Sequence, residues 1–207
     1  MKPMPPDTDL TRRTVLKSLA AAPAAAALTW SDADAAEAVA KHAAHRLAQS
    51  APFQRKFFTD HEWETVRVLV DLIIPRDDRS GSATEAGVPE FMDFTMDDQP
   101  TRRDAMRGGL AWLDQESTRR FDKSFVGASD AERRQVLDDI SWPSKVEPGM
   151  SYGVSFFNSF RDLTASGFFT SRIGIDDLRY QGNVSAPEWK GCPDEAFRSL
   201  GLTPGGE

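Results

Sequence analysis

The chain has 207 residues, with 25 lysines and arginines against 32 aspartates and glutamates, so its formal net charge is −7. An acidic chain with scattered basic residues lacks the positive surface that nucleic acids or anionic membranes attract. Because Cys192 is the single cysteine, the chain can form neither an internal disulfide nor a c-type haem site, which needs two cysteines beside a histidine.

Residues 1–35 have the organisation of a twin-arginine signal peptide. Arg12 and Arg13 precede Leu16 and a short Ala-rich run, and Ala33-Asp34-Ala35 offers a small-residue cleavage site. The run is too short and too weakly apolar to be a stable membrane anchor. We therefore predict export of the folded protein to the periplasm, with about 170 residues left after cleavage, enough for one domain with a core. The alternative is an Ala-rich amphipathic helix with a chance arginine pair.

The next segments predict a spacer and then a well-marked helix. Residues 36–56 are Ala-rich and read as a spacer or a loose helix, followed by a helical core domain over residues 57–170. Thr59 and Glu62 have the spacing of a capping box. The apolar positions that follow recur at helical spacing up to Pro75: Trp63, Val66, Leu69, Val70 and Ile73.

Three further helices are expected. A short one passes through Phe91, and a long one opens near Thr101 and carries an apolar stripe that extends to Phe125. Gly108-Gly109 should weaken the long helix by roughly 1 kcal/mol per glycine relative to alanine. Ser129 and Glu132 form a second capping box for a helix with three apolar positions: Val136, Leu137 and Ile140.

The last long helix is predicted from about Met150 to Gly167, with Gly167 as its C-terminal stop. Period-two alternation is almost absent, so the fold class is all-α, a small irregular helical domain. Residues 171–207 are instead rich in glycine and proline and carry isolated aromatic residues. We expect an extended tail that lies against a surface, because its aromatics would be costly to expose and it could not fold alone.

No constellation for catalysis or metal binding emerges. His42 and His45 could share a helix face, but no third ligand follows at metal spacing. His61 falls in the first turn of the Thr59 helix. The aspartate doublets at 97–98, 138–139 and 176–177 place adjacent side chains in different directions, and no dinucleotide fingerprint or nucleophile elbow is present. We expect no catalytic residue, no metal and no cofactor bound by this chain alone.

Four blocks resemble the gluconate 2-dehydrogenase subunit 3 family and lie in the family's order. Two of them open the core domain, the third leads into the Phe91 helix, and the fourth is a C-terminal signature. The blocks are residues 58–62, residues 72–77, residues 83–91, and the tail positions 167–171, 174–175, 177–178, 180, 182–183 and 189–193. The resemblance covers about Phe57 to Pro193. The chain departs from the family pattern at Arg172, where an acidic residue is expected.

The resemblance implies a non-catalytic small subunit of a membrane-associated dehydrogenase. Its partner would be a large flavoprotein of the glucose-methanol-choline type that binds FAD, oxidises sugars, sugar acids or polyols, and crosses the membrane bound to the small subunit through the twin-arginine translocase. A multihaem cytochrome c is a further partner in many such systems. The alternative is a self-sufficient exported helical protein, either a small-ligand binder or an enzyme. On the first interpretation, the partner interface includes Tyr180, Asn183, Trp189, Cys192 and Pro193.

Cys192 is an unpaired cysteine in a chain predicted for an oxidising compartment. Gly191 and Pro193 should form a turn that presents its sulfur outward, beside Trp189, an aromatic of the kind that anchors interfaces. The sharper hypothesis is a disulfide between Cys192 and the flavoprotein. The alternative is a buried structural thiol.

Overall fold

The computed structural model describes residues 32–48, 53–142, 149–180, 182 and 192–201. The predicted signal residues Arg12, Arg13 and Leu16 lie outside this part of the chain. Within the described residues the fold is all-helical and has no strands, as predicted. The elements are α2 (Asp32–Ala48), α3 (Asp60–Ile73), α4 (Val88–Asp98), the 3-10 turn η1 (Pro100–Arg102), α5 (Arg103–Phe121), α6 (Asp130–Ser141), α7 (Ser151–Phe169), α8 (Arg172–Asp177) and α9 (Asp194–Ser199).

Both predicted capping boxes are present. The backbone N–H of Thr59 donates to Oε2 of Glu62 at 2.8 Å, and the Glu62 N–H donates to the Thr59 hydroxyl at 3.3 Å. The pair Ser129 and Glu132 repeats this exchange at 2.7 and 3.3 Å at the start of α6. Each box satisfies two backbone donors that a helix N-terminus otherwise leaves unpaired. Local sequence therefore determines where α3 and α6 begin.

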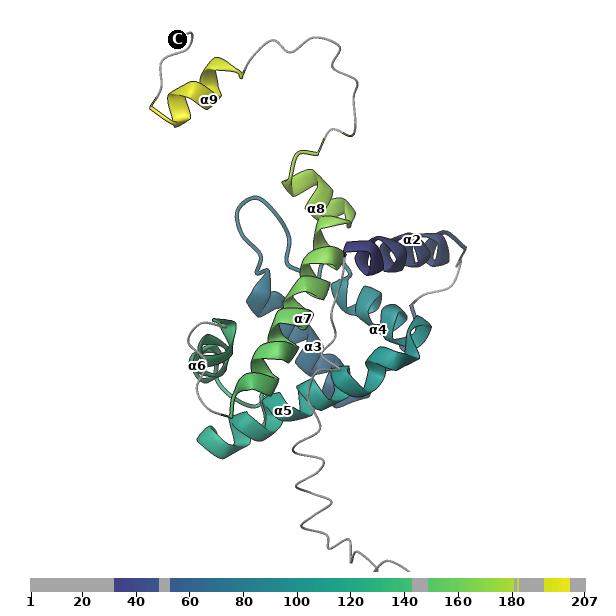
Figure 1. Cartoon of the computed structure of the whole chain (residues 1–207), viewed down its shortest axis with the longest axis vertical. Helices are drawn as coiled ribbons and strands as arrows, with labels where there is room; N and C mark the ends of the chain where they lie inside the picture. Colours follow the sequence, from purple (N-terminus) through teal and green to yellow (C-terminus); the bar gives the residue numbers. More distant parts are fainter. Residues whose placement is uncertain (1–31, 49–52, 143–148, 181, 183–191, 202–207) are drawn as a thin grey trace, which may run out of the picture.

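The central helix is α7, which packs against α4, α5 and α6 (Figure 1). Its buried positions recur at helical spacing and form one broad stripe along the helix, which the neighbouring helices cover. Gly167 does not end this helix, which continues to Phe169. A Cβ at Gly167 would lie 2.7 Å from Cδ1 of Phe91 on α4, so the glycine serves close packing between two helices. The prediction that Gly167 ends the helix was wrong, because this glycine is needed for the contact with α4 and not for a helix terminus.

The two glycines of α5 also mark a helix crossing. A Cβ on Gly109 would lie 1.8 Å from the Phe156 ring of α7, and one on Gly108 would lie 2.3 Å from the Tyr152 hydroxyl. On α7, Gly153 in turn faces the ring of Trp112, at 2.3 Å from the position of its absent Cβ. Small residues on both helices thus let large rings of the opposite helix enter the interface.

The predicted apolar stripe of α5 runs past the end of the helix. Asp122, with φ 57°, adopts the left-handed conformation that closes α5 after Phe121. The chain then turns back, and the N–H of Phe125 donates to Oδ1 of Asp114 at 2.9 Å. Phe125 is fully buried all the same. Its burial was expected correctly, although it belongs to the following turn.

The segment before α3 is attached to the core by Asp93 of α4. This carboxylate is buried and accepts three backbone N–H groups, from Lys56 at 2.8 Å, Phe57 at 2.9 Å and Phe58 at 3.0 Å. Arg107 of α5 donates to the Phe57 carbonyl at 3.0 Å, and its guanidinium lies 4.7 Å from the Phe57 ring centroid. One carboxylate and one guanidinium therefore hold an irregular segment against two helices.

Helix α2 occupies most of the expected spacer or loose helix. His42 packs edge-on against Phe91, with ring centroids 5.4 Å apart, so α2 lies on α4. Asp34, in its first turn, forms an ion pair with Arg102 at 3.3 Å. Cleavage after Ala35, which stays a prediction, would remove this ion pair and shorten α2 by about one turn.

Candidate functional site

The residues predicted for the partner interface lie in the C-terminal part of the chain. Tyr180 follows α8 and is 57 % exposed. Cys192 is exposed, and Pro193 is the exposed N-cap of α9. Asn183 and Trp189 lie outside the described residues. The tail is not wholly extended, because α8 and α9 form within it, but α9 has no buried residue.

Helix α8 is held against the end of α7. The Ser171 hydroxyl accepts the Gly174 N–H at 3.1 Å and caps the helix. Gly174 is buried, and a Cβ there would lie 2.1 Å from the Phe168 carbonyl oxygen and 2.8 Å from Cα of Phe169. Only glycine allows α8 to approach the backbone of α7 this closely.

A second attachment joins α8 to the loop after α3. Arg79 donates to the Asp177 carbonyl oxygen at 2.9 Å, and its guanidinium lies 3.2 Å from the Asp177 carboxylate. The loop is itself ordered by Asp77, which accepts the N–H groups of Arg79 and Ser80 at 2.8 Å each. The Ser80 and Arg79 hydrogen bonds lower the pKa of the Asp77 carboxyl.

The C-terminus of α8 is a Schellman motif without glycine. The Tyr180 N–H donates to the Ile175 carbonyl and the Arg179 N–H to that of Asp176, both at 3.1 Å. Arg179 has φ 52°, a left-handed conformation that costs a non-glycine residue about 1 kcal/mol or more. This closure brings Tyr180 back toward Ile175. Tyr180 was predicted from the sequence, but Ile175, Leu178 and Phe169 were not, although the apolar character of all three and the three-residue spacing of Ile175 and Leu178 were visible.

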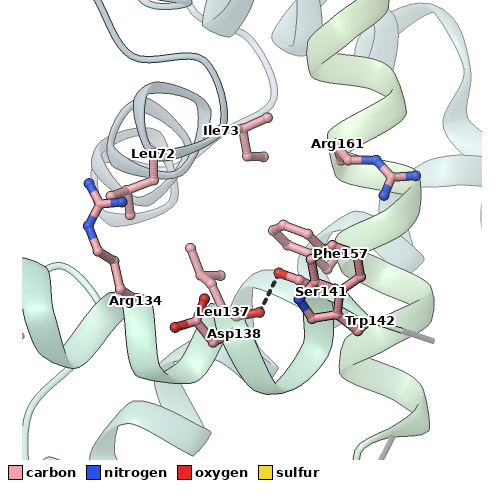
Figure 2. A pocket seen from close by; sticks show the side chains of 9 residues that line it. All are labelled: Leu72, Ile73, Arg134, Leu137, Asp138, Ser141, Trp142, Phe157 and Arg161. Carbon is pink, nitrogen blue, oxygen red and sulfur yellow. Dashed lines mark hydrogen bonds between the residues drawn. The ribbon is translucent and has the colours of Figure 1, made fainter. Parts of the chain in front are cut away.

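A cavity of about 330 Å³ opens between α3, α6 and α7 (Figure 2). Its lining combines apolar side chains with polar and charged ones, Trp142 at its edge is 61 % exposed, and the side chains of Arg134 and Arg161 lie on opposite sides. Each arginine pairs at 2.9 Å with a neighbour in sequence, Asp130 and Asp162 respectively. The lining residues are Leu72, Ile73, Arg134, Leu137, Asp138, Ser141, Trp142, Phe157 and Arg161. The sequence signalled none of this as a site, since its members come from three separate helices.

The strongest pKa shifts belong to groups that stabilise the fold. The Ser129 backbone N–H, the Ser129 hydroxyl and Lys123 lower the pKa of Glu132 to about 2. Arg119 lowers the pKa of Glu116, with a further contribution from Arg120. None of these carboxylates lines the cavity. The shifts therefore reflect capping and ion pairing rather than a catalytic site.

The described histidines and aspartates considered as ligands lie on several different helices. His61 Nε2 lies within hydrogen-bond distance of the Asp114 carboxylate, and this pair links α3 to α5. His42 packs on α4, and the side chain of His45 lies outside the description. Among the described residues, no group of three or more histidine, cysteine, aspartate or glutamate side chains is placed to hold a metal ion. Arg172, the departure from the family pattern, is 94 % exposed and 3.9 Å from Asp176.

The comparison with protein families identifies the chain. The model of the family described as Gluconate 2-dehydrogenase subunit 3 matches residues 60–187, which is more than half of the chain and spans α3 to α8. The chain belongs to this family, and membership implies a small subunit of a dehydrogenase complex. Neither the curated proteins nor the solved structures contain a match. In the described part of the chain, no helix combines the length and the apolar character needed to cross a membrane.

Proposed function

We propose that this chain is the non-catalytic small subunit of a periplasmic, flavin-dependent sugar, sugar-acid or polyol dehydrogenase. Family membership over residues 60–187 is the observation that carries this proposal. In the complex, a large flavoprotein of the glucose-methanol-choline type binds FAD and performs the oxidation. This chain acts in the folding, stability and export of that subunit, and a multihaem cytochrome c would accept electrons as a further subunit.

The export role depends on the twin-arginine signal at Arg12 and Arg13, with Leu16 at the start of the apolar run. Because the twin-arginine route carries folded proteins, a flavoprotein that lacks its own signal can cross the membrane bound to this chain. The test is co-expression of both subunits with the signal intact or with Arg12→Lys and Arg13→Lys together. A lysine cannot reproduce the planar guanidinium fork at a recognition site. Dehydrogenase activity should then stay in the cytoplasm, and normal periplasmic activity would contradict the escort role.

Cys192 offers a covalent link between the subunits. Its exposure supports an intersubunit disulfide over a thiol buried within this chain. Electrophoresis of the purified complex, after thiol blocking, should give a band at the summed mass that disappears on reduction and in Cys192→Ser. If an intramolecular bond is a guide, the link would contribute about 2–4 kcal/mol. Two separate bands without reductant would rule it out.

The cavity between α3, α6 and α7 favours a second candidate function, that of a small-ligand binder. Its volume of about 330 Å³ lies at the lower end of the range for ligand sites. A ligand in it should raise the melting temperature of the isolated chain, and the rise should be lost when Leu137→Arg fills the cavity. The subunit role would be favoured if the isolated chain carries no chromophore and does not oxidise sugars. It would also be favoured if no compound of a ligand library changes the melting temperature of the chain.

A further inference from the structure

Exposed large apolar side chains are concentrated in one short segment of the described part of the chain. Four large hydrophobic residues, more than a third exposed each, fall within twelve positions at the junction of α7 and α8. They are Phe169 at 40 %, Ile175 at 37 %, Leu178 at 56 % and Tyr180 at 57 %. We call these four residues the α8 face. Single exposed apolar residues are normal on a protein surface, whereas several close together indicate an interaction site.

The α8 face is held in a fixed arrangement before any partner binds. Gly174 seats the helix on the backbone of Phe168 and Phe169, and Arg79 ties its C-terminal end to the loop after α3. The Schellman closure at Arg179 folds Tyr180 toward Ile175. A surface ordered in this way loses little conformational entropy when it binds.

The face is too small to form a stable interface by itself. Four side chains that are about half exposed offer on the order of 400 Å². A stable interface buries about 800 Å² on each partner. The face therefore has to be extended by neighbouring surface.

The tail supplies that extension. It continues directly from Tyr180, and its described part finds nothing to bury against: Cys192 is exposed, α9 has no buried residue, and Leu200 is 73 % exposed. A partner that covers both the rigid α8 face and the largely exposed residues 192–201 has to offer a large surface. The catalytic subunit of the proposed complex is such a partner.

We propose that the α8 face is the anchor by which this chain docks on an apolar surface of the catalytic subunit. This inference rests on the proposed function and adds which surface of the folded domain carries the contact. Leu178 and Ile175 insert into the partner, Tyr180 covers them, and the tail continues across the partner from there.

The test measures the affinity of the small subunit for the large flavoprotein purified from the native complex, under reducing conditions so that Cys192 cannot hold the pair. The variant is Ile175→Glu with Leu178→Glu, both exposed positions. Trp142→Glu is the control, because Trp142 is 61 % exposed, comparable to Leu178, and lies at the cavity between α3, α6 and α7. Circular dichroism and thermal melting establish that all three chains are folded.

The double variant should bind at least about 100-fold more weakly, since central apolar residues dominate interface energies, and Trp142→Glu should stay within about threefold of wild type. Equal binding by the double variant, or a loss confined to Trp142→Glu, would overturn the docking surface and leave the proposed function standing. If the wild-type chain forms dimers that the double variant does not, the occupant is a second copy and the inference is wrong. Failure of the wild-type chain to bind the flavoprotein at all would refute the proposed function itself.

Discussion

Replacing Gly109 with alanine tests why α5 carries two consecutive glycines. Alanine favours a helix by about 1 kcal/mol over glycine, so local propensity predicts a gain in stability. The structure predicts a loss, because the new Cβ would lie 1.8 Å from Cδ2 and 2.2 Å from Cγ of Phe156. The Phe156 ring is buried and packs against Phe160 at a centroid distance of 5.5 Å, which leaves it little room to move.

Overpacking a core costs about 1–3 kcal/mol, and so short a contact belongs at the upper end. After subtraction of the helix gain, Gly109→Ala should lower the free energy of unfolding by about 2 kcal/mol, or the melting temperature by roughly 4–8 °C. Gly108 provides the matched control. A Cβ there meets the hydroxyl at the end of the Tyr152 side chain, at 2.3 Å, and the next atom is 3.6 Å away.

Because Tyr152 can turn its end aside, Gly108→Ala should be neutral or up to about 1 kcal/mol more stable. Urea unfolding followed by circular dichroism measures both variants against wild type. The reasoning is refuted if Gly109→Ala is as stable as Gly108→Ala or more so.

Two further predictions concern buried and capping carboxylates. Asp93→Asn should lower the free energy of unfolding by about 2–4 kcal/mol, because its amide nitrogen would face one of the three backbone N–H groups that now donate to the carboxylate. Urea unfolding measures the loss. An unchanged unfolding curve would show that the attachment of residues 56–58 is dispensable. Glu132 has a pKa of about 2 in the folded chain against an ordinary 4.5, so its stabilisation is present above pH 4.5 and is lost as the pH falls toward 2. Glu132→Gln, which keeps a capping side chain, should therefore lose less stability than wild type between pH 5 and 2 in thermal melts, and parallel pH profiles would contradict this.

The α8 face and the cavity at Trp142 are two places where the described chain exposes large apolar groups beside ordered structure. They lie on different elements, and each has its own substitution. The two candidate functions can therefore be separated by experiments on the same protein.

Local sequence was sufficient for the fold class and for most helices. The capping boxes at Thr59 and Ser129 depend on residues three positions apart, and the apolar stripes depend on helical spacing, so both could be read from short windows. The family resemblance was also visible in the sequence, because it rests on blocks of neighbouring residues. The glycine and proline content predicted a tail from residue 171, but the short helices α8 and α9 within it were not expected.

Tertiary structure decided the features that depend on residues far apart in the chain. Gly109 and Gly167 resembled weak points or helix ends, and contact with Phe156 and Phe91 showed that they admit rings from other helices. Asp93 was not singled out in the sequence, because the three backbone N–H groups that it accepts belong to residues 56–58, far away in the chain. The α8 face likewise depends on how Gly174 packs on α7. The physical reason is common to all of them: close packing and buried hydrogen bonds are satisfied by partners whose distance in space is not encoded by their distance in sequence.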